Sequence, residues 1–329
     1  MFSGMIVRLA LPFVALPFVA LPFVALPAMA QPWSPDRPIR FVVSYGAGGP
    51  ADSFARLIAR QMAPRLGQTI TVDNRPGGGG VLASETVARS APDGLTWLLV
   101  DNGLVVYAPA LYARLPYDAD ADLTGMGFIA RFPLVLVVRT ASPMTDWAGF
   151  VAAARARPPT YGSGGVASPQ HLAMEVLRRA SGFEAQHVPY RNSPSAMQDM
   201  LAGNLDCMLT DSASAMPSIR GGAARPLAVL SEARVGILPD VPTARELGLA
   251  DVVAHAWLGI SIPAATPPPA VARLNATLNE AIATDEVATA MRAISAEPLP
   301  GDAAAFNAQV RAEAARWRPL IRELGIRLD

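Results

Sequence analysis

Residues 39–52 read IRFVVSYGAGGPAD, which has the order of a strand, a glycine-rich turn and the start of a helix. Ile39–Val43 is a short apolar run with β-branched residues, as expected of a strand buried on both faces. Three glycines then allow a tight turn and close approach of a ligand, namely Gly46, Gly48 and Gly49. We expect Asp52 to cap a helix over 53–62, where free backbone N–H groups form an anion site. An ordinary turn of any α/β protein has the same pattern, so this stretch alone leaves both interpretations open.

Two further glycine loops, at 74–80 and 161–171, also follow a predicted strand and precede a predicted helix. Strands alternate with helices in both halves of the chain, which predicts parallel sheets. Ligands of open α/β sheets bind at the carboxyl ends of the strands. Because the first and third loops fall in different halves, we expect a ligand between the halves to meet helix N-termini from both sides. Such an arrangement suits an anion, for example a carboxylate.

The predicted domain organisation has two crossings between the halves. Residues 31–134 and 252–329 form one domain and residues 135–251 the other, with a hinge near 130–137 and 250–257. We expect 128–138 to form one or two extended segments, because Pro133 interrupts the run. A short helix is predicted at 244–247 and a long one over 303–324.

The N-terminus has the features of a cleaved signal peptide over residues 1–30. One positive charge, Arg8, precedes an apolar stretch of Leu-Pro-Phe-Val-Ala repeats, and Ala28-Met29-Ala30 is a small-x-small cleavage signature. A membrane anchor is the alternative, but the repeated prolines disfavour a stable membrane helix. We therefore expect export to the periplasm.

Composition excludes several classes of function. Every basic residue is an arginine, so lysine-dependent phosphate loops and Schiff bases are ruled out. The 27 basic and 27 acidic residues balance and are interspersed, which argues against nucleic-acid binding. Cys207 is the only cysteine, so no internal disulfide forms. The three histidines lack metal-ligand spacing, and we expect neither a metal nor a cofactor.

A catalytic triad of Ser163, His171 and Asp211 would make the protein an exported hydrolase. No Gly-x-Ser-x-Gly nucleophile elbow accompanies these residues. We expect His171 instead to pack or hydrogen-bond near the start of its helix, and we expect no enzyme.

The chain resembles the periplasmic receptors of tripartite tricarboxylate transporters, also called Bug receptors. The order and spacing of the matching stretches fit across nearly the whole chain after residue 30. The stretches are Arg37–Ile39, Tyr45–Asp52, Asn74–Gly80, Pro92–Thr96, Pro109–Tyr112, Leu115–Asp118, His187–Arg191 and Leu238–Thr243.

The resemblance implies a two-domain, periplasmic-binding-protein-like α/β fold, each domain a sheet flanked by helices, joined by a two-crossing hinge. It implies a monomer that binds a small carboxylate and delivers it to the membrane subunits of the transporter. In the family, two strand–helix loops grip the carboxylate mainly through backbone amides and ordered waters, with little help from charged side chains. A receptor that presents its ligand to a membrane sensor would have the same fold and site.

By the same resemblance, the two gripping loops are Tyr45–Asp52 and Ser163–His171. We expect the ligand-binding residues to come from these loops, from the glycine loop at 74–80 and from two later strand ends. They are Tyr45, Ala47, Gly48, Gly49, Asp52, Asn74, Gly79, Ser163, Gly165, Ser168, His171, Tyr190 and Asp211. Asp52 would repel an anion, so we expect it to hold the loop or, if the ligand is an amino acid, to accept from its ammonium group.

The chain departs from the family's pattern at four loop positions. Ala51 stands where Thr or Ser is usual, Pro169 and Gln170 replace small hydroxyl residues, and Asn192 replaces a glycine. These changes bear on which ligand is bound.

Overall fold

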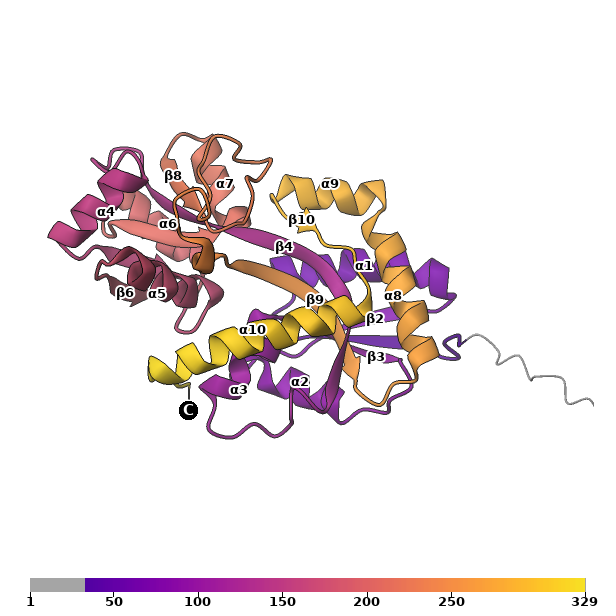
Figure 1. Ribbon diagram of the computed structural model, residues 1–329. Helices are drawn as coiled ribbons and strands as arrows, with labels where there is room; N and C mark the ends of the chain where they lie inside the picture. Colours follow the sequence, from indigo (N-terminus) through magenta and orange to yellow (C-terminus); the bar gives the residue numbers. More distant parts are fainter. Residues whose placement is uncertain (1–32, 329) are drawn as a thin grey trace, which may run out of the picture. The chain divides into compact units, whose positions relative to one another are not determined.

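A computed structural model describes residues 33–328, so the predicted signal peptide lies outside the described part of the chain (Figure 1). Its mixed sheet has the strand order β2-β1-β3-β9-β4-β7-β5-β6. Strands β8 and β10 pair with β4 beside this path.

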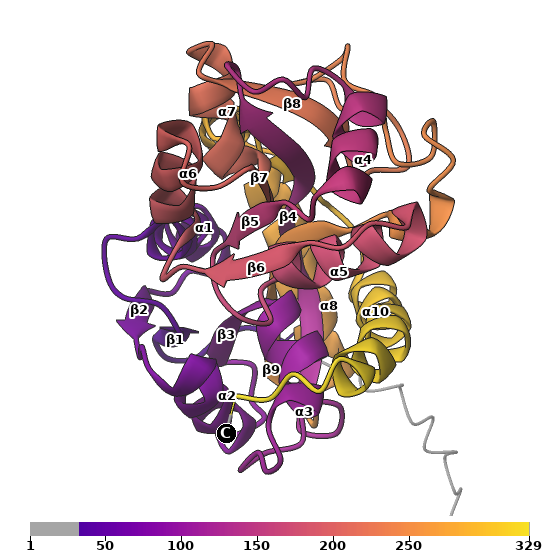
Figure 2. The same cartoon turned by 90° about the vertical axis from the view of Figure 1, so that its left-hand side faces the viewer.

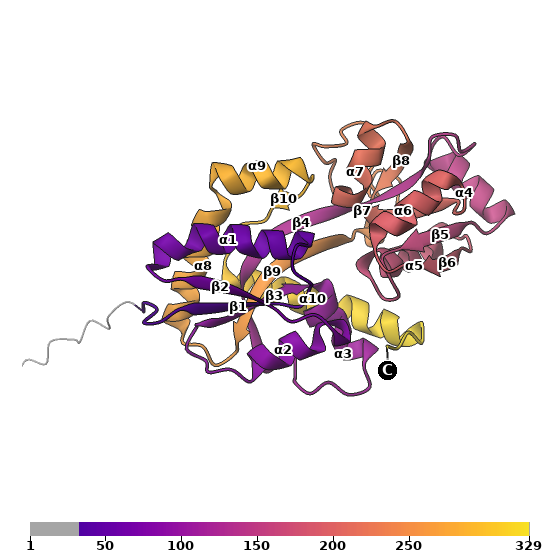
Figure 3. The same ribbon diagram turned by 180° about the vertical axis from the view of Figure 1, so that it is seen from behind.

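The first part of the sheet contains the strands nearest the N-terminus. Strands β1 (Ile39–Val43), β2 (Ile70–Asn74) and β3 (Thr96–Asp101) are parallel, and β9 (His255–Pro263) pairs antiparallel with β3. Successive residues of a strand point to opposite faces of the sheet. The apolar side chains of β1 therefore pack against helices on both faces. Phe41 and Val43 pack with α1 (Pro50–Leu66) and α8 (Pro268–Ile282). Val42 packs in the cluster that includes α2 (Val81–Ala88) and α10 (Ala303–Glu323). Figure 3 shows α1 and α2 on opposite sides of β1, β2 and β3.

The second part of the sheet lies within the segment predicted as the other domain. Its strands are β5 (Thr160–Ser163), β6 (Gln186–Pro189), β7 (Cys207–Asp211) and β8 (Ala224–Val229), and β5 is parallel to β6 and β7. Helices α4 (Trp147–Ala156) and α5 (Pro169–Ser181) belong to one core cluster. Helices α6 (Ser193–Ala202) and α7 (Ser212–Arg220) belong to another, on the opposite face (Figure 2).

The strand β4 (Leu123–Arg139) joins the two parts. It pairs with β9 as far as Pro133, which lies opposite His255, and with β7 from Leu134 onward. Pro133 has no N–H to donate, and it stands where the partner strand changes. The sequence allowed one or two segments here, and the structure has one continuous strand. Because β4 runs antiparallel to β7, β8, β9 and β10, the sheet is mixed rather than parallel throughout.

Several predicted boundaries need correction. Helix α1 starts earlier than expected, with Gly49 as its N-cap, so Asp52 lies in the first turn and is not the cap. Residues 244–247 form a turn rather than a helix. The elements that the sequence did not predict are α3 (Ala108–Leu111), α9 (Asp285–Ala293), β10 (Glu297–Pro298), a π-helix at Gly103–Tyr107 and 3-10 turns at Gly78–Gly80 and Ala250–Val252. No helix within residues 33–328 is long and apolar enough to cross a membrane.

Candidate functional site

A cavity of about 500 Å³ opens at the carboxyl ends of six strands. The segments that follow β1, β2, β3, β5, β6 and β7 all contribute to its lining. These are the positions at which the topology of an open α/β sheet places a ligand. Strands β4 and β9 complete the lining through Phe132 and through Ala256–Leu258, so both predicted domains contribute to one cavity.

Four helices begin at this cavity. Ala51 of α1, Pro169 and Gln170 of α5, Ser193 of α6, and Ala213 of α7 all line it. The N-terminus of a helix carries a partial positive charge and unpaired N–H groups. The described lining residues include no arginine or histidine, and the chain has no lysine. The groups in this lining that can stabilise an anion are therefore helix N-termini and neutral donors rather than basic side chains.

Three of these helices have side-chain caps that also line the cavity. The N–H of His171 donates to Oγ of Ser168 at 3.3 Å, and the N–H of Ser195 donates to Oδ1 of Asn192 at 2.9 Å. Both caps act through oxygen, which leaves the O–H of Ser168 and the amide N–H groups of Asn192 as neutral donors. Helix α7 differs, because its cap is the carboxylate of Asp211, which also accepts from Nε2 of Gln170 at 3.1 Å.

Asp101, at the end of β3, is the second carboxylate that lines the cavity. It accepts hydrogen bonds from the hydroxyl of Tyr45 and from the N–H of Leu104. Burial raises the pKa of Asp101, and the negative charge of Asp101 raises the pKa of Tyr45 well above its ordinary value. The pattern of this segment, a strand ending in Asp101-Asn102-Gly103, matches the other strand ends, yet Asp101 was not among the predicted site residues.

The loop after β1 is held by a charged cluster beneath it. The carboxylate of Asp52 accepts from the N–H of Gly48 at 2.9 Å, from Nε of Arg56 at 3.0 Å and from Nδ2 of Asn74 at 2.9 Å. Asn74 also donates to the carbonyl of Tyr45. Hydrogen bonding by Arg56 lowers the pKa of Asp52 to about 2. Asp52 therefore stabilises the loop and stays charged, as one of the sequence interpretations expected.

The loop after β5 is held by neutral side chains. Oγ of Ser163 lies 2.7 Å from Nε2 of His187, and the N–H of Ala167 donates to Nδ1 of His171 at 3.0 Å. The two imidazoles stack with centroids 3.9 Å apart. Burial lowers the pKa of both histidines, that of His187 to about 4. Both rings are therefore uncharged near neutral pH.

This geometry does not form the triad considered from sequence. The hydroxyl of Ser163 pairs with His187 rather than with His171. His171 uses Nδ1 for the backbone of Ala167, and Asp211 caps α7. Among the described residues, no hydrogen bond joins the three proposed triad members to one another.

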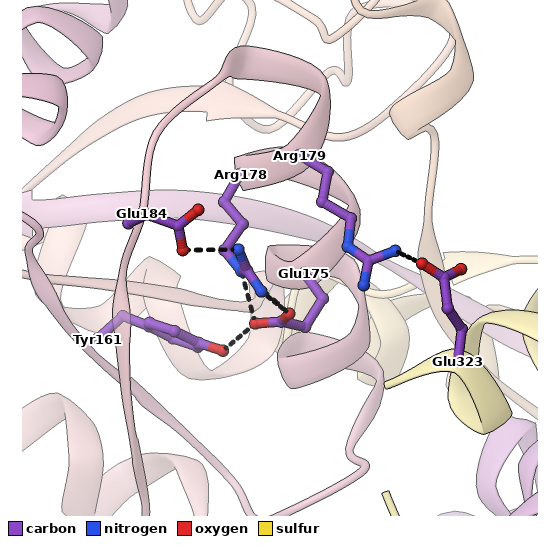
Figure 4. Close-up of polar contacts among 6 residues, drawn as sticks. All are labelled: Tyr161, Glu175, Arg178, Arg179, Glu184 and Glu323. Atoms are coloured by element: carbon purple, nitrogen blue, oxygen red, sulfur yellow. Dashed lines mark hydrogen bonds and ion pairs between the residues drawn. The ribbon is translucent and has the colours of Figure 1, made fainter. Parts of the chain in front are cut away.

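Helix α5 is anchored at its other end by an ionic cluster (Figure 4). Glu175 accepts from Tyr161 at 3.2 Å and forms a two-pronged ion pair with Arg178. Arg179 pairs with Glu323 of α10 at 2.8 Å, which connects α5 to the C-terminal helix. These contacts fix the helix whose N-terminus faces the cavity.

The structure brings only part of the predicted site to the cavity surface. The predicted residues that line the cavity are Tyr45, Gly79, Ser168 and Asp211. The others are not among its lining residues: Ala47, Gly48, Gly49, Asp52, Asn74, Ser163, Gly165, His171 and Tyr190. Several of these support the loops, and Tyr190 donates to Asp199 at 2.6 Å.

Large apolar side chains also line the cavity, and none of them was predicted from the sequence as a site residue. They are Phe54, Leu104, Leu111, Phe132, Trp257, Leu258 and Ile294. They come from widely separated elements, so only the tertiary fold brings them together. Residues 33–328 contain no cluster of His, Cys, Asp or Glu side chains arranged to hold a metal.

Comparison with known proteins gives consistent matches. Residues 54–326 match the model of the tripartite tricarboxylate transporter family receptor. A protein encoded in the tcbD-tcbE intergenic region of Pseudomonas sp. strain P51 is 37% identical over 88% of this chain and 87% of its own length. BugT of Bordetella pertussis is 32% identical, over 89% of this chain and 91% of its own length.

Solved structures match the fold over a similar extent. An R. palustris protein with adipate has a TM-score of 0.76 and 32% identity, covering 88% of this chain and 98% of its own. MatC from Rhodopseudomonas palustris with bound malate has a TM-score of 0.73 and 32% identity, and the match covers 87% of this chain and 99% of MatC. The periplasmic binding protein BugD has a TM-score of 0.74 and 30% identity, and the match covers 89% of this chain and 99% of BugD.

Proposed function

Because this chain belongs to the family of tripartite tricarboxylate transporter receptors, we propose that its cavity binds a small carboxylate and that the protein delivers this ligand to the membrane subunits of such a transporter. The chain is a solute receptor with the two-domain α/β fold of periplasmic binding proteins. Its family is one of receptors rather than of enzymes. Relatives solved with adipate and malate support a carboxylate as the ligand.

The observation that carries this proposal is the convergence of helix N-termini on a cavity without basic side chains. An anion in this position is stabilised by helix dipoles and neutral donors. The cap of α7 is itself a carboxylate, and α1 carries Asp52 in its first turn, whereas α5 and α6 have neutral caps and no acid in the first turn. The ligand carboxylate therefore lies against α5 and α6.

The donors proposed for this carboxylate differ from the glycine amides predicted from sequence. The N–H of Gly48 is bonded to Asp52, and the N–H of Gly165 donates to Oγ of Ser163 at 3.2 Å. Neutral donors at the starts of α5 and α6 take their place: the side chains of Ser168, Gln170, Asn192 and Ser193. Tyr45 and Gly79 contact the rest of the ligand from the other domain.

The proposed domains, 31–134 with 252–329 and 135–251, close on the ligand about a hinge at 130–137 and 250–257. Support comes from β4, where the pairing partner changes from β9 to β7 between Pro133 and Leu134. The protein acts as a monomer in the periplasm after its signal peptide is cut before Gln31.

A thermal-shift screen against small carboxylates, followed by calorimetric titration, tests the function. We expect at least one acid to raise the melting temperature and to bind with 1:1 stoichiometry. The acid should be recovered unchanged, because a receptor consumes nothing. Stoichiometric binding of no carboxylate, or turnover of the bound acid, would contradict the proposal.

A further inference from the structure

We propose that the ligand carries a single carboxylate on an apolar body, and that the cavity discriminates against a second charged group. This inference rests on the proposed function and defines the class of acid that the site selects. It depends on the side chains of the cavity wall rather than on the ends of the helices.

One wall of the cavity is apolar and comes from a single core cluster. Phe54, Phe132, Leu258 and Ile294 line the cavity and all belong to the cluster built on α1, α8 and α9. Phe54 and Phe132 meet edge to face with ring centroids 6.3 Å apart. We call these four residues the apolar wall. A polar or charged group placed against it would lose its hydration without gaining a partner, which costs binding free energy.

The charges in the cavity argue against a second carboxylate. Asp101 and Asp211 both line it, and no described lining residue is basic. Both carboxylates accept hydrogen bonds from protein donors in the folded chain. A dicarboxylate would therefore bring its second charge near two like charges, with no arginine to neutralise it. One carboxylate is accommodated because the neutral ends of α5 and α6 supply donors.

The size of the cavity agrees with a compact acid. Its volume of about 500 Å³ falls in the range of roughly 300–1,000 Å³ that is typical of small-molecule sites. Apolar contacts over such a wall add affinity in proportion to the area that is buried. A six-carbon chain or a benzene ring offers such area, whereas a short hydroxy acid offers little.

Three six-carbon acids that differ at one end provide the test. Hexanoate ends in a methyl group, adipate in a second carboxylate and 6-aminohexanoate in an ammonium group. We expect calorimetric titration of the full mature chain to rank hexanoate first and adipate last, with adipate weaker than hexanoate by on the order of tenfold. 6-Aminohexanoate should bind between them, because Asp101 and Asp211 offset part of the cost of placing its ammonium group against the apolar wall. Benzoate and terephthalate form a second, rigid pair, in which benzoate should bind more tightly.

A variant of the apolar wall makes the test specific. Ile294→Ser should weaken hexanoate binding by roughly three- to tenfold. The variant and the wild type should bind acetate with nearly the same affinity, because acetate is too short to reach the wall. The matched control is Ile237→Ser, a half-buried isoleucine outside the cavity lining, which should bind hexanoate as the wild type does.

The outcomes separate this inference from the proposed function. Adipate or 6-aminohexanoate binding as tightly as hexanoate, or more tightly, would overturn the inference and leave the receptor function in place. Unchanged hexanoate binding by Ile294→Ser would also overturn it. If none of the acids in either set binds, both this inference and the proposed receptor function are contradicted.

Discussion

The loops after β1 and β5 occupy equivalent positions at strand ends, yet one is held by ions and the other by neutral rings. In the first loop, Asp52 accepts from the N–H of Gly48 and from Arg56. In the second, His171 accepts from the N–H of Ala167 while its ring stacks on His187. In both loops, protein groups already occupy amides that a ligand would need. The two loops differ in charge: the first contains the ionised carboxylate of Asp52, whereas the second contains two uncharged imidazoles. An anion is therefore favoured at the second loop.

Removal of the ionic support should have the largest effect on stability. Asp52→Ala leaves the Gly48 N–H, Arg56 and Asn74 without their shared acceptor. We expect the free energy of unfolding to fall by about 2–3 kcal/mol, because hydrogen bonds to charged groups are involved. Urea denaturation measures this loss. Asp36→Ala, an exposed carboxylate near the N-terminal end of the described chain, is the control and should change stability little.

The pH dependence of the Asp52 contribution has a defined sign. The pKa of Asp52 is lowered from 3.8 to about 2 in the folded chain, so its contribution is present above pH 3.8 and is lost as the pH falls toward 2. The stability difference between wild type and Asp52→Ala should therefore shrink over that window. A difference that stays constant down to pH 2 would contradict this account of the first loop.

The neutral support should respond to pH in a higher window. Burial lowers the pKa of His187 from 6.5 to about 4, so the unfolded chain binds a proton more readily between these values. Stability should be fully present above pH 6.5 and decrease as the pH falls toward 4, by about 1–2 kcal/mol after allowance for partial exposure. His187→Gln should remove its share of this decrease in urea titrations at several pH values, while His171 and His255, whose pKa values burial also lowers, keep the remaining slope. A wild-type stability curve without slope between pH 6.5 and 4 would be the contrary result.

The neutral donors at the starts of α5 and α6 should matter for binding, and Ser168, which also caps α5, should contribute to stability as well. Ser168→Ala and Ser193→Ala should each weaken binding of the acid by roughly ten- to a hundredfold, as expected for one hydrogen bond to a charged group. Ser195→Ala, on the same helix as Ser193 but outside the cavity lining, is the matched control. Calorimetric titration compares the three variants. Equal affinities for all of them would place the carboxylate elsewhere.

The smallest effect is expected at the surface link between α5 and α10. Arg179 and Glu323 form an exposed ion pair that joins elements of the two proposed domains (Figure 4). Exposed pairs contribute at most about 1 kcal/mol. Arg179→Ala should therefore lower the melting temperature only slightly and less in high salt. A loss as large as that of Asp52→Ala would show that this contact, rather than the loop, maintains the structure.

Strand and helix positions were largely predictable, because apolar periodicity and proline or glycine breakers act locally. Strand β1 has the bounds of its apolar run, 39–43, and α10 ends at Glu323, one residue before the predicted end at 324. The prediction that Asp52 is the N-cap of α1 was wrong, because its carboxylate instead accepts hydrogen bonds from Arg56 and Asn74. Local sequence does not reveal the contact with Asn74, which lies 22 residues away.

The candidate site was predictable only where it follows strand ends. The loops containing Tyr45 and Ser168 were expected at the cavity, and both line it. The pairing of Ser163 with His187, rather than with His171, depends on the register of β5 against β6, which no local pattern fixes. The apolar wall joins residues as distant as Phe54 and Ile294, so its existence required the tertiary structure.

A crystal structure of the mature chain with its tightest-binding acid tests the central claim most directly. We predict the ligand carboxylate within about 3 Å of donors from Ser168, Gln170, Asn192 or Ser193, with the apolar body against Phe54, Phe132 and Ile294. A carboxylate bonded instead to the amides of residues 46–49, or a ligand outside this cavity, would contradict the account.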